Sequence, residues 1–523
     1  MTPDEHTGTM HEQGSDADAD GDMNSDIETR PWWSVIAVGA ALTVLIRLRA
    51  FWTPITSDEG GFIAIARAWA HGDTLYRDVW VDRPQGLLIV FRLWDRVSGG
   101  STSSVRVMAM LFGVGLVVAV AVATTALAGR TAGGLAAVLV GITAASPAIE
   151  GHLANGELLS GAFAAAGFAC ACIAVRQPQR QWLFVLSGVI GGCALSIKQS
   201  GYEGLLAIGL WLVIATAMHW RTPRDAAVAL SRVLIGVGMV IGGLAIHGAL
   251  SGFSRWWFAF AGYRLGQRSA IEGADWDRFF MTARIARPTI WPLLALIVIG
   301  AVVVTVRRSR SRSPSSIGDR TNVGAACLLW LWPVAASVAF LTGGQFHRHY
   351  WITLCPGLSA LAAGLLARRL RPAIAFGIAI AALVPTSVNT FKILATTDDE
   401  FPVKASGDNR PNTDEYLAAW FVAHRDPGDR LYIMCASAGF YADAHEDPVF
   451  PYLWQDNVGK VAGALDKLGA LLSSPTAAPR FIAIYEDPNR CDSSGRLETV
   501  VNANYVAYAD VGDIAVLQRV SRS

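Results

Sequence analysis

Long apolar runs constrain this chain more than any other feature of its sequence. Between Trp32 and Pro385 one apolar run follows another, and many are about 17–25 residues long, which is the length that a helix needs to cross a bilayer. Hydrophobic residues make up 52% of the 523 residues and charged residues only 16%, which excludes a large soluble protein. We therefore expect a mainly α-helical, polytopic membrane protein with about eleven transmembrane helices. The expected spans are 32–51, 105–127, 132–148, 157–175, 182–197, 202–219, 227–250, 289–306, 322–342, 351–368 and 372–388.

The distribution of arginine predicts how these spans are oriented. Short cytoplasmic loops of membrane proteins are enriched in Lys and Arg. The short loops at 149–156, 198–201 and 343–350 carry only Lys198 and Arg348. We therefore expect a multi-pass plasma-membrane protein with a cytoplasmic N-terminus, and with the C-terminal region outside. The basic residues of the alternate, cytoplasmic loops would be Arg130, Arg176, Arg180, Arg221, Arg224, Arg307, Arg308, Arg310, Arg312, Arg320, Arg368, Arg369 and Arg371.

Composition divides the chain into three parts. Residues 1–30 hold nine acidic residues and one Arg with few large apolar side chains, which predicts a disordered cytoplasmic tail. Residues 31–396 would form the transmembrane domain, with a long outer loop at 52–104. Residues 397–523 alternate between helix and strand patterns, which predicts a small extracytoplasmic α/β domain. This last part has no glycine-rich nucleotide loop, which favours a substrate-positioning or structural role.

The outer loop at 52–104 contains the most informative stretch of the sequence. The acidic pair Asp58-Glu59 directly follows the first apolar run and opens a helical pattern that Gly72 ends. A second helical segment starts at Arg83-Pro84. We expect both segments to be amphipathic helices that lie in the membrane interface. The tryptophans expected at headgroup depth are Trp69, Trp80 and Trp94.

Polar residues of mixed type gather at the outer ends of the predicted spans, whereas the inner loops carry mainly arginine. Ionisable residues at a membrane edge are costly and tend to mark function. Cations there could hold an anionic phosphate, and a carboxylate could act as general base on a hydroxyl acceptor. A sugar carried on a lipid phosphate needs both, and a single displacement would invert the anomeric centre. The residues are Asp58, Glu59, Asp78, Asp82, Arg83, Glu150, His152, Asn155, Glu157, Lys198, Gln199, Glu203, Gln345, His347, Arg348, His349 and Tyr350.

Several motifs, in this order along the chain, resemble a known superfamily. The resemblance is carried by TSDEGGFIAIARAW after the first run, VDRPQGLLIV, NGELLSGAFAAAG, SIKQSGYEG and HRHYWITLCPGLSALAAG, and it covers about residues 32–400. These segments resemble the polytopic GT-C glycosyltransferases that use polyprenyl-phosphate sugars, the branch that contains protein O-mannosyltransferases and the bacterial aminoarabinose–lipid A transferase. The resemblance implies a GT-C fold. It also implies transfer of a hexose or pentose from a polyprenyl-phosphate donor to a cell-envelope glycan, lipid or protein on the outer face of the plasma membrane.

The resemblance also implies roles for single residues. Asp58 matches the acidic residue of the family's first outer loop, which is implied to be the catalytic base, and Glu59 is its partner. Arg83 stands where many relatives have Lys in a Lys-Pro-Pro-like motif and is implied to bind the donor phosphate, although the motif here is Arg-Pro-Gln. Further candidates for binding the donor phosphate or sugar are Lys198, Arg348, Tyr350 and Glu157.

A divalent metal is a possible cofactor, because some relatives bind one in this pocket. The possible ligands are Glu59, Glu157 and His347, but their spacing is not that of a dedicated metal site. The expected partners are the polyprenyl-phosphate sugar, the envelope acceptor and membrane lipid. The sequence has no basic stripe with interleaved aromatic residues, so it does not indicate a nucleic-acid partner.

Structural interpretations of these residues stay open. Asp58 could cap the interfacial helix, and Lys198 could extend to the interface without a further role. Arg83 could contact lipid headgroups, and the histidines at 347 and 349 could lie in a solvated loop. For the whole protein, the alternatives are a transporter or flippase of lipid-linked sugars and a non-catalytic protein of envelope assembly. Five cysteines fall in the apolar runs, whereas Cys435 and Cys491 of the outer domain could form a disulfide.

Overall fold

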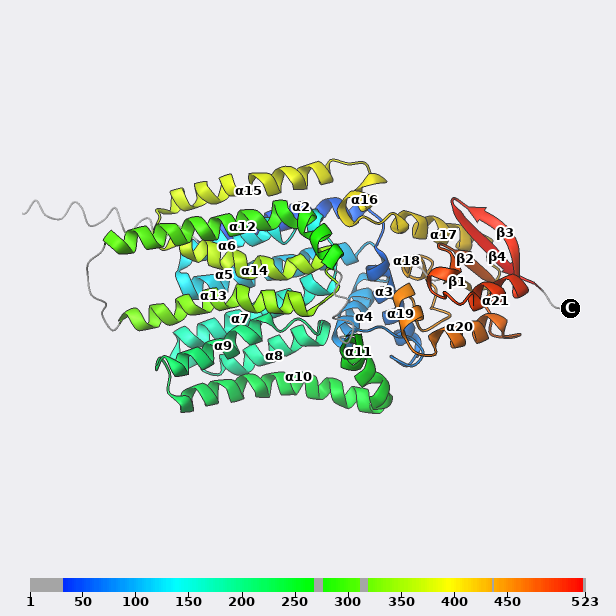
Figure 1. Cartoon of the computed structure of the whole chain (residues 1–523), viewed down its shortest axis with the longest axis horizontal. Helices are drawn as coiled ribbons and strands as arrows, with labels where there is room; N and C mark the ends of the chain where they lie inside the picture. The colour runs from blue at the N-terminus through cyan, green and yellow to red at the C-terminus, as the bar shows by residue number, and fades with distance from the viewer. Residues whose placement is uncertain (1–31, 268–275, 311–317, 435–436, 521–523) are drawn as a thin grey trace, which may run out of the picture.

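The computed structural model describes residues 32–267, 276–310, 318–434 and 437–520. A bundle of long helices forms one end of the molecule, a small domain with a β-sheet forms the other, and short helices lie between them (Figure 1). The predicted acidic tail at 1–30 lies outside the described residues, so its disorder stays a prediction.

The helices of the bundle coincide with the predicted apolar runs. Within the described residues, seven helices are long and apolar enough to cross a membrane, which confirms a multi-pass helical membrane protein. Shorter apolar helices of 10–17 residues account for the remaining runs, so the count of about eleven spans stays a prediction. The bundle consists of α2 (Trp33–Leu48), α5 (Val105–Ala128), α6 (Arg130–Thr143), α7 (Gly156–Arg176), α8 (Leu183–Ile197), α9 (Glu203–Ala217), α10 (Pro223–Trp257), α12 (Trp276–Arg310), α13 (Gly318–Thr342), α14 (Leu354–Ala367) and α15 (Pro372–Leu394).

Small residues bring these helices close together. A Cβ added to Gly39 of α2 would lie 2.5 Å from the carbonyl oxygen of Ala137 in α6, and one added to Gly141 would lie 2.4 Å from the carbonyl oxygen of Gly39. A larger side chain would not fit at either position. Close backbone packing of this kind holds helices together in lipid, where burial of apolar surface gives no driving force.

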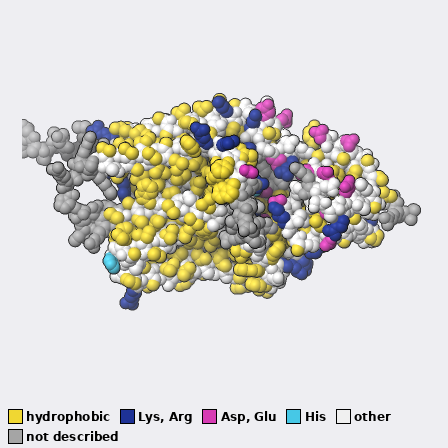
Figure 2. All heavy atoms as spheres, in the orientation of Figure 1, with side chains coloured by type: hydrophobic (Ala, Val, Ile, Leu, Met, Phe, Trp, Pro, Cys, Tyr) yellow, Lys and Arg dark blue, Asp and Glu magenta, His cyan; other side chains and the backbone are white. Residues whose placement is uncertain are grey.

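The surface of the molecule reflects these two regions. Hydrophobic side chains cover most of the helical bundle on the face that Figure 2 shows, whereas acidic and basic side chains gather toward the C-terminal domain. An apolar belt of this extent is the surface that hydrocarbon requires and water does not tolerate.

The outer loop folds between the bundle and the C-terminal domain, and here the structure differs from expectation. Helix α3 (Ser57–His71) is buried without a break from Glu59 to Ala68, because it packs against α4 (Gln85–Ser98) and against α18 (Gly439–Asp443) of the C-terminal domain. It is therefore not an interfacial helix. Trp80 does not present its ring to lipid, since it is 2% exposed and packs on Tyr452 at 5.4 Å between ring centroids. Helix α4 does expose an apolar face, formed by Ile89, Leu93 and Val97.

The C-terminal region is a small α/β unit, as predicted. Its sheet has the strand order β1-β2-β4-β3, in which β1 (Leu431–Met434) and β2 (Phe481–Ile484) are parallel. Strand β4 (Ile514–Arg519) is antiparallel to both β2 and β3 (Tyr505–Val511). The segment 455–473 forms two helices rather than one, because Gly463 adopts a φ of 73° between them. The helices are α16 (Glu400–Ser406), α17 (Arg410–His424), α18 (Gly439–Asp443), α19 (Gln455–Lys460), α20 (Ala464–Ser473) and α21 (Arg496–Asn504).

The two regions share one core, and the predicted boundary at residue 397 stays a prediction. Phe62 of α3 belongs to the same buried cluster as Phe421 and Phe440 of the C-terminal region. The five cysteines in the bundle are free thiols. Cys491 is disulfide-bonded, whereas Cys435 lies outside the described residues, so the proposed pairing of these two stays a prediction.

Candidate functional site

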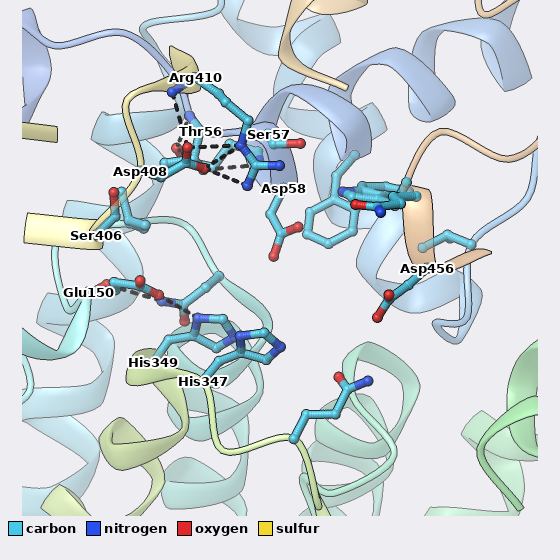
Figure 3. A pocket seen from close by; sticks show the side chains of 18 of the residues that line it. Thr56, Ser57, Asp58, Glu150, His347, His349, Ser406, Asp408, Arg410 and Asp456 are labelled. Carbon is cyan, nitrogen blue, oxygen red and sulfur yellow. Dashed lines mark hydrogen bonds and ion pairs between the residues drawn. The ribbon is translucent and has the colours of Figure 1, made fainter. Parts of the chain in front are cut away.

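A cavity of about 830 Å³ lies where the helical bundle meets the C-terminal domain (Figure 3). The start of α3, the segment before α4 and the loop before α7 line it from the bundle, together with Gln345, His347 and His349. The short helix α11 (Tyr263–Gln267) also contributes to the lining. Residues 406–410, 454–457 and 485–486 line it from the C-terminal region. The cavity therefore collects side chains from segments that are far apart in the sequence.

Asp58 occupies the second position of α3 and points into this cavity (Figure 3). It does not cap the helix, because Thr56 is the N-cap residue and forms a capping box with Glu59. The carboxylate of Asp58 is half-buried and has no hydrogen bond or ion pair to any described residue. Burial raises the pKa of Asp58, while the charges of His349 and Arg83 act in the opposite direction. Asp58 is thus a carboxylate whose basicity is increased and whose oxygens are open to the cavity.

Glu59 is held in a different way. It is fully buried, and its Oε1 accepts hydrogen bonds from Nη1 of Arg106 at 2.6 Å and from the amide of Ala154 at 2.9 Å. Its Oε2 accepts from the amide and hydroxyl of Thr56, at 3.1 and 2.9 Å. Both carboxylate oxygens are therefore occupied, and Glu59 anchors the start of α3 to α5 and to the loop before α7.

Arg83 lies on the cavity beside a second arginine, Arg264. Nη1 of Arg83 is 3.0 Å from Oδ2 of Asp82, and Arg264 of α11 forms an ion pair with the same carboxylate oxygen. Burial acts to raise the pKa of Asp82, but Arg264 and Arg83 outweigh it and hold that pKa below its usual value. Two guanidinium groups are thus kept at one edge of the cavity by a single ionised aspartate.

The histidines form a third group. The rings of His347 and His349 stack almost parallel at 5.5 Å, and both line the cavity. Nδ1 of His349 is 2.5 Å from Oε2 of Glu150, and Nε2 is 3.7 Å from Oε1 of Glu157. Burial lowers the pKa of His347 well below its usual value. His349 lies between two carboxylates, so its surroundings favour the charged form of its ring, whereas those of His347 do not.

Lys198, Glu157 and Tyr350 lie in a layer behind this group and do not line the cavity. Lys198 forms an ion pair with Glu157, and its Nζ lies 3.9 Å from the ring centroid of Tyr350. Arg348 is farther removed, since its guanidinium group faces the carbonyl oxygens of Lys404 and Ala405 on α16. Of the residues predicted to bind the donor, Arg83 therefore lines the same cavity as Asp58. Lys198, Glu157 and Tyr350 lie in the layer behind it, and the side chain of Arg348 points to α16 instead.

The three possible metal ligands do not form a shared site. Glu59 is neutralised by Arg106 and Glu157 by Lys198, so both carboxylates already pair with a cation. Among the residues that the structure describes, no group of three or more His, Cys, Asp and Glu side chains is arranged to hold a metal ion. The donor atoms of the predicted set thus do not fit a divalent metal.

Sequence reasoning missed the cavity lining that the C-terminal region contributes, including Arg410, Trp454 and Tyr485. One signal for it was present, in the two glycines after the acidic pair. A Cβ added to Gly60 would lie 2.5 Å from Cα of Gly439, and one added to Gly61 would lie 2.4 Å from Cζ2 of Trp454. Consecutive glycines inside a helix indicate that another part of the chain approaches closely.

Comparison with known proteins identifies the fold. No protein-family model and no curated protein sequence matches the chain. The crystal structure of ArnT from Cupriavidus metallidurans bound to undecaprenyl phosphate matches with a TM-score of 0.59 and 14% identity, over 93% of this chain and 98% of that chain. The archaeal oligosaccharyltransferase AglB from Archaeoglobus fulgidus, in complex with an inhibitory peptide and a dolichol-phosphate, matches with a TM-score of 0.54 and 14% identity, over 93% of this chain and 74% of that chain. The chain therefore has the GT-C membrane fold, as its motif order predicted.

Proposed function

We propose that this chain is a membrane glycosyltransferase that transfers a single sugar from a polyprenyl-phosphate donor to an acceptor of the cell envelope. The observation that carries the proposal is Asp58, a half-buried carboxylate with no partner among the described residues, in a cavity that also holds Arg83 and His349. The fold adds support, because solved structures that share it hold undecaprenyl phosphate or a dolichol-phosphate.

Asp58 acts as the general base in this reaction. It accepts the proton of the acceptor hydroxyl while the hydroxyl oxygen bonds to the anomeric carbon of the donor sugar. The bond from that carbon to the phosphate oxygen breaks, and its electron pair leaves with the polyprenyl phosphate. This single displacement inverts the anomeric centre. A raised pKa makes Asp58 a stronger base than an exposed aspartate, which favours proton transfer near neutral pH.

Arg83 and Arg264 bind the donor phosphate and stabilise the charge that develops on it as it leaves. Asp82 holds both guanidinium groups in place at the cavity edge. Arginine suits this role because its planar group donates paired hydrogen bonds to phosphate oxygens. Lys198, Glu157 and Tyr350 serve to position His349 rather than to contact the phosphate, because they lie behind the cavity lining. Glu59 has a structural role, and Arg348 fastens α16.

The cavity faces the outside of the plasma membrane in this proposal. Helix α7 starts beside the cavity and ends at Arg176, 21 residues and about 30 Å away, in a loop with Arg180. The arginine-rich loops are thus at the far end of the bundle, where the positive-inside bias would put the cytoplasm.

Sugar transfer in proteoliposomes tests the proposal. Wild-type protein is supplied with a panel of labelled polyprenyl-phosphate monosaccharides and envelope extracts, beside Asp58→Asn and a control, Asp466→Asn, which removes an exposed carboxylate far from the cavity. We expect transfer by the wild type and the control, and none by Asp58→Asn at equal thermal stability. Full transfer by Asp58→Asn would refute the assignment of the base. A flippase would move donor across the bilayer without forming a new glycosidic bond.

A further inference from the structure

The wall that the C-terminal region gives to the cavity differs in chemistry from the edge that holds Arg83. We define this C-terminal wall as residues 408–410, 454–457 and 485–486. Asp408 and Arg410 of this wall lie beside the start of α3, which carries Asp58 (Figure 3). The wall contains an indole, a phenol, amides and carboxylates. The proposed function assigns no role to it.

Two aromatic side chains of the wall are fixed in position. The ring of Trp454 packs on Phe62 at 5.9 Å between centroids and lies against Gly61 of α3. The hydroxyl of Tyr485 donates a hydrogen bond of 2.7 Å to Oδ1 of the buried Asp414. Aromatic rings held in this way cost little conformational entropy when a ligand stacks on them. The apolar face of a sugar ring is a common partner for such a ring, whose π-face attracts the partial positive charge of C–H groups.

Trp454 also carries an unused donor. Its indole Nε1–H is buried and has no hydrogen-bond partner among the described residues. An orphan donor of this kind costs free energy in the empty protein, and a hydroxyl of a bound ligand could satisfy it. Asn409 and Asn457 also line the cavity and add amide donors and acceptors.

The charges of the wall disfavour an anionic ligand. Along its described residues Arg410 is the one cation, and its Nε and Nη2 donate to the two oxygens of Asp408 at 2.8 Å each. The other charged groups of the wall are the carboxylates of Glu486 and of Asp456, which pairs with Lys460 at 3.0 Å. A phosphorylated headgroup would meet these carboxylates and no cation whose charge is unmatched, whereas a hydroxyl-rich neutral molecule would find acceptors.

The wall also disfavours an extended peptide. None of the described residues that form it belongs to a β-strand, since β2 ends at Ile484 before the last segment begins. A peptide therefore could not add to the sheet there, which is the usual way in which an extended chain gains main-chain hydrogen bonds.

We propose that the C-terminal wall is the acceptor subsite and that the acceptor is a neutral carbohydrate, rather than a phosphorylated lipid or a peptide. This inference rests on the proposed function and specifies its substrate. Trp454 stacks on the acceptor ring, the amides and carboxylates bind its hydroxyls, and one further hydroxyl reaches Asp58, which lies on the helix that Trp454 packs against.

Binding is tested first, because it does not depend on the donor. Saturation-transfer NMR on the full-length protein in nanodiscs is run with neutral linear oligosaccharides, with a phosphorylated lipid headgroup and with a Ser/Thr peptide. The variants are Trp454→Ala, Trp454→Phe and Asp456→Asn. Tyr508→Ala serves as a control that truncates an exposed aromatic side chain of β3. We expect oligosaccharide binding that Trp454→Ala weakens about tenfold or more, that Trp454→Phe partly restores and that the control leaves unchanged.

Kinetics separate this inference from the function on which it rests. In the transfer assay, the wall variants should raise KM for the glycan acceptor while KM for the donor stays within about twofold. Asp456→Asn covers the case in which Trp454→Ala fails to fold, because Asp456 is exposed. Two results would overturn the inference. One is transfer of labelled sugar to only the lipid or only the peptide, and the other is oligosaccharide binding that no wall variant weakens. Absence of donor turnover together with intact oligosaccharide binding would instead refute the proposed function.

Discussion

The backbone amide of Ala438 donates a hydrogen bond of 3.0 Å to the hydroxyl of Ser57, across 381 residues of sequence. Ser57 is the first residue of α3 and directly precedes Asp58. Two more hydrogen bonds join the same outer loop to the C-terminal domain. The amide of Trp80 donates to the carbonyl oxygen of Pro451 at 3.1 Å, and Nη1 of Arg67 donates to the carbonyl oxygen of Ala442 at 2.8 Å. The C-terminal domain is thus part of the framework that positions the proposed base.

Gly61→Ala should disturb this framework. The added Cβ would lie 2.4 Å from Trp454, which forces the domain or the indole to move, and overpacking of this kind costs about 1–3 kcal/mol. We expect lower activity and faster proteolysis of the C-terminal domain, measured by a time course of limited digestion. Gly115→Ala in α5 is the matched control, because a Cβ there meets nothing within 4 Å. Equal protease resistance of both variants would contradict the prediction.

Glu59→Gln should destabilise the protein. It would leave Arg106, whose side chain is 1% exposed, without its carboxylate, and breaking a buried ion pair costs about 3–5 kcal/mol. We expect a lower melting temperature in detergent than for Glu498→Gln, a neutralisation at an exposed position. A Glu59→Gln protein with wild-type stability but no activity would instead support the chemical role that the sequence suggested for Glu59.

The pH dependence of transfer should report on Asp58. A protonated carboxyl cannot accept the proton of the acceptor, so kcat/KM should fall as the pH is lowered through the raised pKa of Asp58. Arg83 holds this pKa down, so Arg83→Ala should move the acidic limb to higher pH, whereas Arg83→Lys should restore most of its position. An acidic limb that stays in place in Arg83→Ala would show that another group controls it.

Arg83 and Arg348 should differ in their effect on the donor. Removal of a charge-assisted contact to phosphate costs about 1.5–3 kcal/mol, so Arg83→Ala should raise KM for the donor about ten- to hundredfold. Arg348→Ala should leave that KM unchanged and lower thermal stability, because Arg348 donates to carbonyl oxygens of α16. Initial rates measured over a range of donor concentrations give the donor KM of the wild type and of both variants. A raised donor KM in Arg348→Ala would contradict the placement of this side chain.

The fold could be predicted from the sequence because lipid imposes a simple rule, that a span must be long, apolar and helical. The place of Asp58 at the cavity could also be predicted, since its position after the first span sets it apart. The contacts of Glu59 could not be predicted, because Arg106 and the amide of Ala154 belong to other elements of the fold. The spacing of Thr56 and Glu59 does match a capping box. The outer helix α3 was mistaken for an interfacial one because its covering domain is encoded about 380 residues later, and periodicity carries no information on such contacts.

The junction between Ser57 and Ala438 has a consequence for biogenesis. Chains generally fold as they are synthesised, N-terminal parts first. Every helix of the bundle can be inserted before residues 438–454 exist, but α3 then has α4 beside it and lacks the C-terminal residues that cover its other side. A nascent chain that has completed its membrane spans therefore has no finished cavity until the last quarter of the polypeptide docks.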